Sequence, residues 1–231
     1  MATSTRRQVA LDTETTGMDA VKGDRLIEIG CVEILNRRLT QNVFHTRINP
    51  EREVDAEAAK VHGMTWEVLK KEPKFEAVVD DFLDFIKGAE LLIHNAEFDV
   101  GFIDHELGLL NKGKLTDYCA GVVDTLKLAQ DLRPGQRNNL DTLCAAYKID
   151  ASKRVRHGAE IDAELLAEVY LAMTQGQESL DIQAVDDTGL PPVPDVSSLR
   201  VVAASEAELK AHEETLKRID AKDSKGKLVW R

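Results

Sequence analysis

Three short segments of the chain place acidic side chains where a metal ion could bind. Asp12 and Glu14 lie two residues apart, directly after an apolar run. A β-strand directs alternate side chains to the same face, so the two carboxylates are expected side by side. Such a pair supplies hard oxygen ligands that suit Mg²⁺ or Mn²⁺. The same pair is also common at a solvated strand end, but the Thr-Thr-Gly that follows gives a backbone that a ligand can approach closely.

The second segment, HNAEFDVGF, contains Asp99. Asp99 lies three, four and eleven residues before Phe102, Ile103 and Leu110, which places the acid on the inward stripe of a helix. A carboxylate that points towards a core needs compensation, which a metal ion can supply. An Asp that caps the start of the helix is an alternative of similar weight.

The third segment, RHGAEIDAELLAEVY, contains His157 and Asp162. Asp162 is followed at helical spacing by Leu166, Val169 and Met173, so it too lies at the end of a buried stripe. His157 precedes a glycine and is expected in the loop before the helix. An imidazole beside a metal-binding carboxylate can act as a general base towards water. A surface histidine is the alternative.

The elements that position these residues follow an α/β pattern. Residues 7–12 predict a short strand that ends at the acids, residues 26–35 and 39–48 a hairpin about Asn36–Arg38, and residues 90–95 a short buried strand. Helical periods occupy 56–63, 65–71, 75–88, 97–110, 125–132, 139–147 and 159–173. Strands that alternate with helices indicate an α/β domain with a mixed sheet flanked by helices.

The composition changes after Thr174. Residues 175–198 contain three of the six prolines and no helical stripe, which is typical of a flexible linker. Residues 199–231 have a strand-like start, a charged helical middle and an apolar end. This segment is too short to bury a core of its own and is expected to pack on its own domain or on a partner. We therefore predict a catalytic domain over 1–174, a linker and a small C-terminal segment.

Bulk properties exclude several classes of protein. A net charge of −11 argues against a protein that grips long duplex through phosphate neutralisation, but not against one that holds a strand end through cations. No apolar run is long enough to span a membrane and no signal peptide is readable, so a cytoplasmic location is expected. The three cysteines, Cys31, Cys119 and Cys144, are expected to be reduced thiols.

Together, the three segments resemble the DEDD exonuclease superfamily, in the DEDDh branch whose third motif carries a histidine. The matching residues, in the family order, are Asp12, Glu14, Asp99, His157 and Asp162. The resemblance spans residues 7–174, includes VHGMT at 61–65, and is strongest to members that proofread for a bacterial replicative DNA polymerase. It implies a ribonuclease H-like fold.

The resemblance also implies a mechanism, which is 3′–5′ hydrolysis of single-stranded DNA ends by two-metal phosphoryl transfer. By analogy, Asp12 bridges both ions, Glu14 and Asp162 complete one ion site, and Asp99 supports the other. His157 takes the proton from the attacking water. Glu57 and His62 are implied to contact the terminal nucleotide, together with the ligands Asp12, Glu14 and Asp162. Glu57 has the alternative of being a solvated helix residue.

Two further similarities concern partners. Gln177, Leu180 and Ile182 in QESLDI are similar to the peptide that docks on the bacterial sliding clamp, and an extended linker suits a peptide groove. Residues 199–231 are similar to the segment that binds the polymerase catalytic (alpha) subunit. A small stabilising subunit is a further partner that the sequence leaves open.

Two other functions are consistent with parts of the sequence. An RNA-trimming exonuclease of the same superfamily would have the same active-site residues, but it has no evident need for residues 175–231. A catalytically silent adaptor between polymerase and clamp would not need all five site residues.

Overall fold

The computed structural model describes residues 6–152, 154, 156–175 and 204–220. The chain divides into two units, Met1–Asp181 and Ile182–Arg231. The predicted linker beyond Gln175, the clamp-like peptide and both ends of the predicted C-terminal segment lie outside the described residues.

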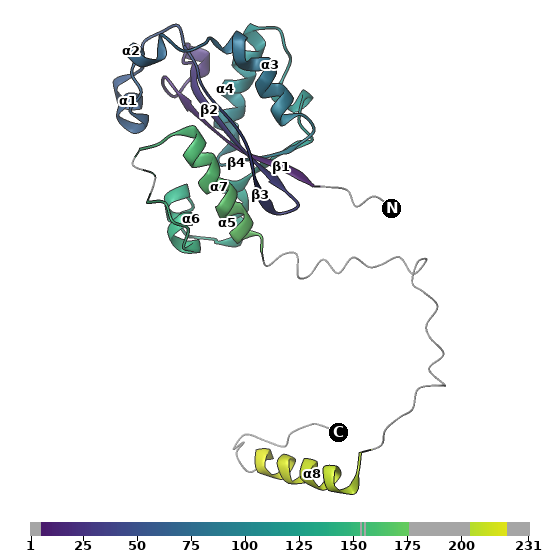
Figure 1. The fold of residues 1–231 in the computed structure, drawn as a ribbon. Coiled ribbons are helices and arrows are strands. Elements are labelled where there is room, and N and C mark those ends of the chain that lie inside the picture. The colour runs from purple at the N-terminus through teal and green to yellow at the C-terminus, as the bar shows by residue number, and fades with distance from the viewer. Residues whose placement is uncertain (1–5, 153, 155, 176–203, 221–231) are drawn as a thin grey trace, which may run out of the picture. The chain divides into compact units, whose positions relative to one another are not determined.

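The first unit is built on a five-stranded mixed sheet (Figure 1). Its strands are β1 (Arg7–Thr15), β2 (Leu26–Leu35), β3 (Arg38–Arg47), β4 (Glu90–Ile93) and β5 (Gly121–Asp124), in the order β3-β2-β1-β4-β5. β2 is antiparallel to both of its neighbours, whereas β1, β4 and β5 run parallel. The predicted mixed sheet is therefore confirmed.

The strands differ from the sequence prediction chiefly at β1 and β5, and β4 ends at Ile93 rather than at residue 95. β1 does not end at Asp12 but continues to Thr15, because Thr13 and Glu14 still pair with β2. β5 was not predicted, since it has only four residues and two apolar side chains. Both acids of the first segment therefore lie inside a strand, where their backbone is fixed by pairing.

The predicted hairpin is confirmed. β2 and β3 are joined by Asn36 and Arg37, which both have positive φ, at 48° and 61°. Two consecutive left-handed residues give the tight turn whose twist matches that of paired strands. The Arg37 side chain also donates hydrogen bonds to Thr174 Oγ1 and to the Leu171 carbonyl, both at 2.9 Å. The turn is thereby tied to the end of the third acidic segment.

Helices cover both faces of the sheet (Figure 1). They are α1 (Ala56–His62), α2 (Trp66–Leu69), α3 (Phe75–Ile86), α4 (Ala96–Leu109), α5 (Thr125–Leu132), α6 (Leu140–Tyr147) and α7 (Ala159–Met173), with two short 3₁₀ turns at Ala20–Lys22 and Leu115–Asp117. Each helix of this unit was predicted, with ends that differ by at most three residues. The 3₁₀ turns were not.

The alternation of side chains along β1 separates two cores. Val9 and Leu11 pack with α3 and α4 in one buried cluster, whereas Ala10 packs with α6 and α7 in the other. The period of two therefore directs Asp12 and Glu14 towards the α7 face. Burial of apolar side chains on both faces, worth about 25 cal/mol per Å², holds the strand between its helix layers.

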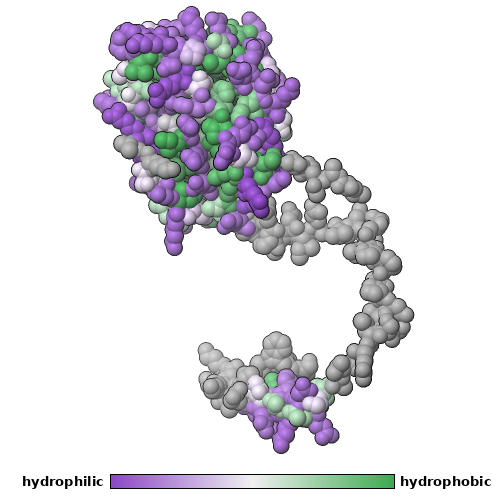
Figure 2. All heavy atoms as spheres, in the orientation of Figure 1, coloured by the Kyte–Doolittle hydropathy of each residue, from purple (hydrophilic) through white to green (hydrophobic). Residues whose placement is uncertain are grey.

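The remaining predictions concern thiols and membranes. The three cysteines are free; Cys31 and Cys144 are buried and Cys119 is partly buried. Within the described ranges, no helix has the length and apolar character needed to cross a bilayer. Polar residues cover most of the visible surface in Figure 2, with hydrophobic residues interspersed.

The described part of the second unit is one helix, α8 (Glu206–Asp220), which confirms the predicted helical middle of the C-terminal segment. Its start is fixed locally, because Ser205 Oγ lies 3.3 Å from the Glu208 amide while the Glu208 carboxylate accepts from the Ser205 amide at 2.8 Å. This reciprocal capping box satisfies amides that a helix start leaves unpaired.

Candidate active site

The first two acids lie near the C-terminal end of the central strand β1, where α7 begins. Asp12 and Glu14 are both partly buried and line one cavity of about 230 Å³. Asp12 lies opposite Gly30 of β2, and Glu14 lies opposite Glu28. The strand brings the pair to one face, as the spacing predicted.

Asp99 reaches the same cavity from the other helix layer. It is 5% exposed, and its Oδ1 accepts a hydrogen bond of 2.6 Å from the Thr13 hydroxyl. Thr13 lies between the two β1 acids, so this bond ties α4 to the strand at the site. Asp99 is not the N-cap residue, because Asn95 occupies that position and Asp99 lies within the first turn of α4.

Asp162 and His157 close the cavity from α7 and the loop before it. Asp162 is 3% exposed, and its helical companions Leu166, Val169 and Met173 are buried as predicted. His157 lies in the loop with a 45% exposed side chain, and its Nδ1 is 3.2 Å from Asp162 Oδ2. The structure thus brings all five predicted residues to one cavity.

Arg154 also lines this cavity and was not singled out from the sequence. Its side chain is only 8% exposed and forms ion pairs with Asp162 and with Asp141 of α6. Its Nη2 donates to Asp162 Oδ2 and to His157 Nδ1, each at 2.7 Å. The guanidinium therefore orients the acid and the imidazole and offsets part of the local negative charge. Its place within RVRH, beside the histidine, was the available signal.

Burial is the main cause that raises the pKa of three of these acids. Burial raises the pKa of Glu14 to about 8, and repulsion from Asp162 and Glu28 adds to the effect. Burial also raises the pKa of Asp99 to about 7. Burial, followed by the charges of Asp99, Asp162 and Glu14, raises the pKa of Asp12 well above its usual value. Such a cluster favours the uptake of either protons or cations.

The cluster fits divalent cations. Ligand atoms of Glu14, His157 and Asp162 lie within 4.8 Å of one another. Asp162 Oδ1 is buried and forms an ion pair with Arg154 Nε without a well-directed hydrogen bond. Carboxylate oxygens held close together in a buried cavity are the donor set that Mg²⁺ and Mn²⁺ prefer.

An apolar cavity of about 280 Å³ adjoins the acids. The two cavities share Thr13, Glu14, Asn95 and Phe98. The second is further lined by Thr15, Gly17, Met18, Ala58, Val61 and His62. This pairing of an apolar pocket with an acidic one suits a nucleoside next to its phosphate.

The two predicted substrate residues differ in position. His62 is 6% exposed, lines the apolar cavity, and accepts a 3.0 Å hydrogen bond at Nδ1 from the Met64 amide. Burial lowers the pKa of His62, so its neutral form is favoured. Glu57 is exposed on α1, pairs with Lys60 and lines none of the cavities described above. The structure does not bring Glu57 to the site.

Comparison with known proteins identifies the class. A model of the exonuclease family matches residues 9–170, which include every acid of the cavity as well as His157. The match spans more than half of the chain, so the chain belongs to the exonuclease family.

Relatives define the family more narrowly. The chain is 50% identical to DNA polymerase III subunit epsilon of Salmonella typhimurium and 47% identical to that of Escherichia coli K12, with 100% of both chains covered in each case. The chain therefore belongs to the family of DNA polymerase III epsilon subunits. The prediction of a 3′–5′ exonuclease of the DEDDh type is confirmed. These relatives do not support the alternative of a catalytically silent adaptor.

Solved structures confirm the fold. The nuclease domain of 3′hExo, a DEDDh family member bound to rAMP, is 17% identical with a TM-score of 0.64, and the match covers 76% of this chain and 95% of that one. Exonuclease X in complex with 5′-overhanging duplex DNA is 21% identical with a TM-score of 0.59, covering 74% and 93%.

Proposed function

We propose that this chain hydrolyses the 3′-terminal phosphodiester of single-stranded DNA with two divalent cations, Mg²⁺ or Mn²⁺. The observation that carries the proposal is the convergence of four carboxylates and one imidazole from three distant segments on one cavity. Bound cations neutralise the charge that develops on the phosphoryl group and activate the attacking water.

The chain's own residues divide the work. Asp12 would contribute to both cation sites, and Glu14 and Asp162 would complete one of them. Asp99 would support the other site, and the Thr13 hydroxyl donates a hydrogen bond that holds this carboxylate in place. Because the four acids come from rigid elements, their carboxylates are preorganised for cation binding.

His157 accepts the proton of the attacking water. Its Nδ1 contacts Arg154 and Asp162, and a guanidinium can only donate a hydrogen bond. A neutral imidazole that accepts at Nδ1 keeps its proton on Nε2. His157 therefore becomes a base when the contact with Arg154 opens and Nδ1 is released, a movement that an exposed loop side chain can make.

The apolar cavity receives the terminal nucleoside. Met18, Val61 and Phe98 offer apolar surface for the base and sugar, and His62 contacts the nucleotide from the cavity wall. Contact of Glu57 with the nucleotide remains a prediction and requires that its pairing with Lys60 be exchanged. The names of the relatives, which are subunits of a DNA polymerase, favour DNA over RNA.

Residues beyond the catalytic domain connect it to the replication machinery in the cytoplasm. Residues 199–231 bind the polymerase catalytic subunit, and Gln177, Leu180 and Ile182 bind the sliding clamp. The exposed surface of α8 supports the first contact. Truncation after Thr174 is expected to abolish co-purification with the polymerase subunit but not nuclease activity, and Leu180→Ala to weaken clamp binding alone. A small stabilising subunit is a further candidate partner.

One assay tests the catalytic proposal. Metal-stripped protein is given 5′-labelled DNA and RNA of the same single-stranded sequence, with Mg²⁺, Mn²⁺ or a chelator. We expect stepwise shortening from the 3′ end that requires a cation and is faster on DNA, and His157→Ala should remove most of it. Faster cleavage of RNA would favour the RNA-trimming alternative, and activity in the chelator would contradict the proposal.

A further inference from the structure

Glu28 occupies an unusual position for an acid. It is the third residue of the apolar strand β2, is 3% exposed, and is the register partner of Glu14. Burial alone would raise the pKa of Glu28, but hydrogen bonds from His45, the Ala159 amide and Arg47 lower it below its usual value. The structure therefore keeps a buried negative charge two strand positions from Gly30, where β2 meets α7.

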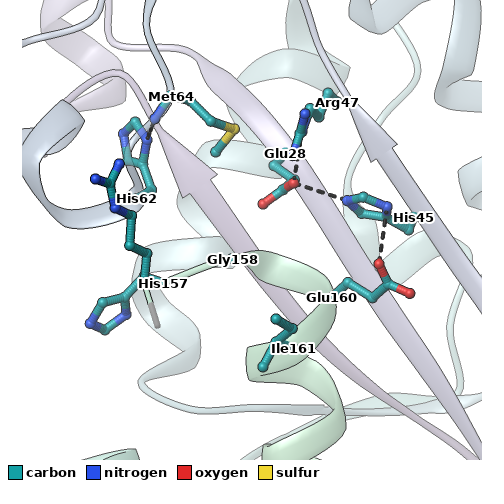
Figure 3. Close-up of a pocket in the computed structure, with 10 residues that line it drawn as sticks. Glu28, His45, Arg47, His62, Met64, His157, Gly158, Glu160 and Ile161 are labelled. Atoms are coloured by element: carbon teal, nitrogen blue, oxygen red, sulfur yellow. Dashed lines mark hydrogen bonds and ion pairs between the residues drawn. The ribbon is translucent and has the colours of Figure 1, made fainter. Parts of the chain in front are cut away.

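Figure 3 shows the contacts of this carboxylate with β3. Glu28 Oε1 accepts from His45 Nε2 at 2.9 Å and from Arg47 Nε at 3.3 Å. His45 in turn contacts helix α7, because its Nδ1 lies 3.2 Å from Glu160 Oε2. One oxygen of Glu28 is thus held by β3.

The other oxygen binds the start of α7. Glu28 Oε2 accepts a hydrogen bond of 2.9 Å from the Ala159 amide, the first of the helix. A helix start has amides without intrahelical partners, and the preceding Gly158 supplies no side chain to cap them. A carboxylate at this end also complements the helix dipole. Glu28 therefore acts as a cap that comes from a distant strand.

Two more contacts fix α7 against the same hairpin. A Cβ atom on Gly30 would lie 2.2 Å from the Ala159 carbonyl group, so the glycine allows β2 and the helix start to touch. At the opposite end of α7, Arg37 donates to the Leu171 carbonyl. The β2–β3 hairpin thus presents a negative group to the start of the helix and a positive group to its end.

The helix held in this way carries the third catalytic segment. His157 is two residues before Ala159 and Asp162 is three residues after it. The cavity of about 310 Å³ shown in Figure 3 has Glu28 and His45 on one wall and His157 on another. A shift of the Ala159 amide would therefore move the proposed base and a proposed metal ligand together.

We propose that Glu28, itself held by His45, is a positioning residue for the exonuclease reaction, which places His157 and Asp162 by fixing the first turn of α7. This inference rests on the roles proposed above for those two residues. It adds a group on β2 whose two carboxylate oxygens are both bound by other groups of the protein.

The kinetic test compares variants of Glu28 with a matched acid on the same strand. Glu28→Ala should lower kcat about 10- to 100-fold with KM changed less than about threefold, because misplacement by about 1 Å costs this much. Glu28→Gln should recover part of kcat, since its carbonyl oxygen can still accept from the Ala159 amide, while its amide group faces His45 and loses the hydrogen bond from Arg47. Glu33→Ala, which removes a partly buried ion pair with Arg7 but no contact with α7, should leave kcat unchanged.

Amide hydrogen exchange tests the positioning itself, without substrate. In the wild-type protein the Ala159 amide should be protected, although the first amide of a helix usually exchanges rapidly. Protection should be lost in Glu28→Ala and partly lost in His45→Ala. The His45→Ala variant provides the test if Glu28→Ala does not fold. Unprotected Ala159 in the wild type, or a folded Glu28→Ala with unchanged kcat, would overturn the proposal. Protected Ala159 together with full activity in Asp162→Ala would instead refute the proposed catalytic roles.

Discussion

Helices α7 and α8 each have 15 residues, and the structure uses them in opposite ways. α7 buries nine side chains, is bound by β2 at its start and by the Arg37 turn at its end, and carries Asp162 into the catalytic cavity. α8 has no buried side chain among its described residues 206–217 and is capped by its own Ser205. Tertiary contacts hold α7 in one place, whereas the described side chains of α8 are mostly exposed, as the proposed contact with a partner requires.

The largest effect is expected where α7 meets the chemistry. Asp162→Ala should lower the rate of 3′–5′ hydrolysis by about three orders of magnitude or more, because the lost ligand stabilises charge in the transition state. Glu164→Ala, an exposed acid two residues further along the same helix, is the matched control and should retain full activity. Single-turnover rates on labelled DNA measure both, and near wild-type turnover in Asp162→Ala would refute its assignment.

Truncation of one leucine in each helix tests whether that helix is packed against the rest of the chain or exposed. Leu166 of α7 is 1% exposed, so Leu166→Ala should lower the free energy of unfolding by about 2–5 kcal/mol. Leu209 of α8 is 55% exposed, and Leu209→Ala should change the free energy of unfolding by less than about 0.5 kcal/mol. Denaturant unfolding of the whole chain provides the comparison. Equal losses would mean that α8 packs on its own chain.

The acids around α7 should make metal binding depend on pH. Protons compete with cations for Glu14 and Asp99 below their raised pKa values of about 8 and about 7. The half-saturating Mn²⁺ concentration should therefore fall as the pH rises from 6 to 9, by up to about tenfold per pH unit for each proton displaced. Binding followed by electron paramagnetic resonance measures this, and a constant affinity would contradict the buried, crowded cluster.

The same raised pKa values predict how the stability of the metal-free protein depends on pH. An acid whose pKa is raised by folding contributes stability at low pH that is lost as the pH rises through the folded value. For Glu14 the loss spans about pH 4.5 to about pH 8, from its unperturbed to its raised pKa. The Tm without metal should therefore fall across this range, and saturating Mn²⁺ should reduce the fall.

The smallest effect concerns the start of α8. Ser205→Ala removes the hydroxyl half of the capping box and should destabilise this helix by about 1 kcal/mol. Circular dichroism of a peptide of residues 203–222 would show reduced helicity, while the Tm of the nuclease domain should not change. A loss of nuclease stability would show that α8 contributes to the domain.

Periodicity in the sequence predicted much of the difference between the buried α7 and the exposed α8. The helical spacing of Leu166, Val169 and Met173 placed Asp162 on a buried stripe, and the charged middle of the tail was correctly assigned as a helix. The end of β1 was missed, because the polar Thr13 and Glu14 look like a turn until pairing with β2 is known. The roles of Arg154 and Glu28 were also missed, since each depends on contacts between segments distant in the sequence. An acid inside the apolar run LIEIGCVEIL was the signal for Glu28.

Titration of metal-stripped protein with Mn²⁺ tests most directly whether the four acids form one two-cation site. We expect two ions per wild-type chain in the presence of a nucleoside monophosphate, and recovery of nuclease activity in parallel with the binding. Asp12→Asn, which removes the proposed bridging charge, should bind fewer ions or bind them far more weakly, and should be inactive while keeping its fold. Two tightly bound ions and full activity in Asp12→Asn would contradict the proposed site.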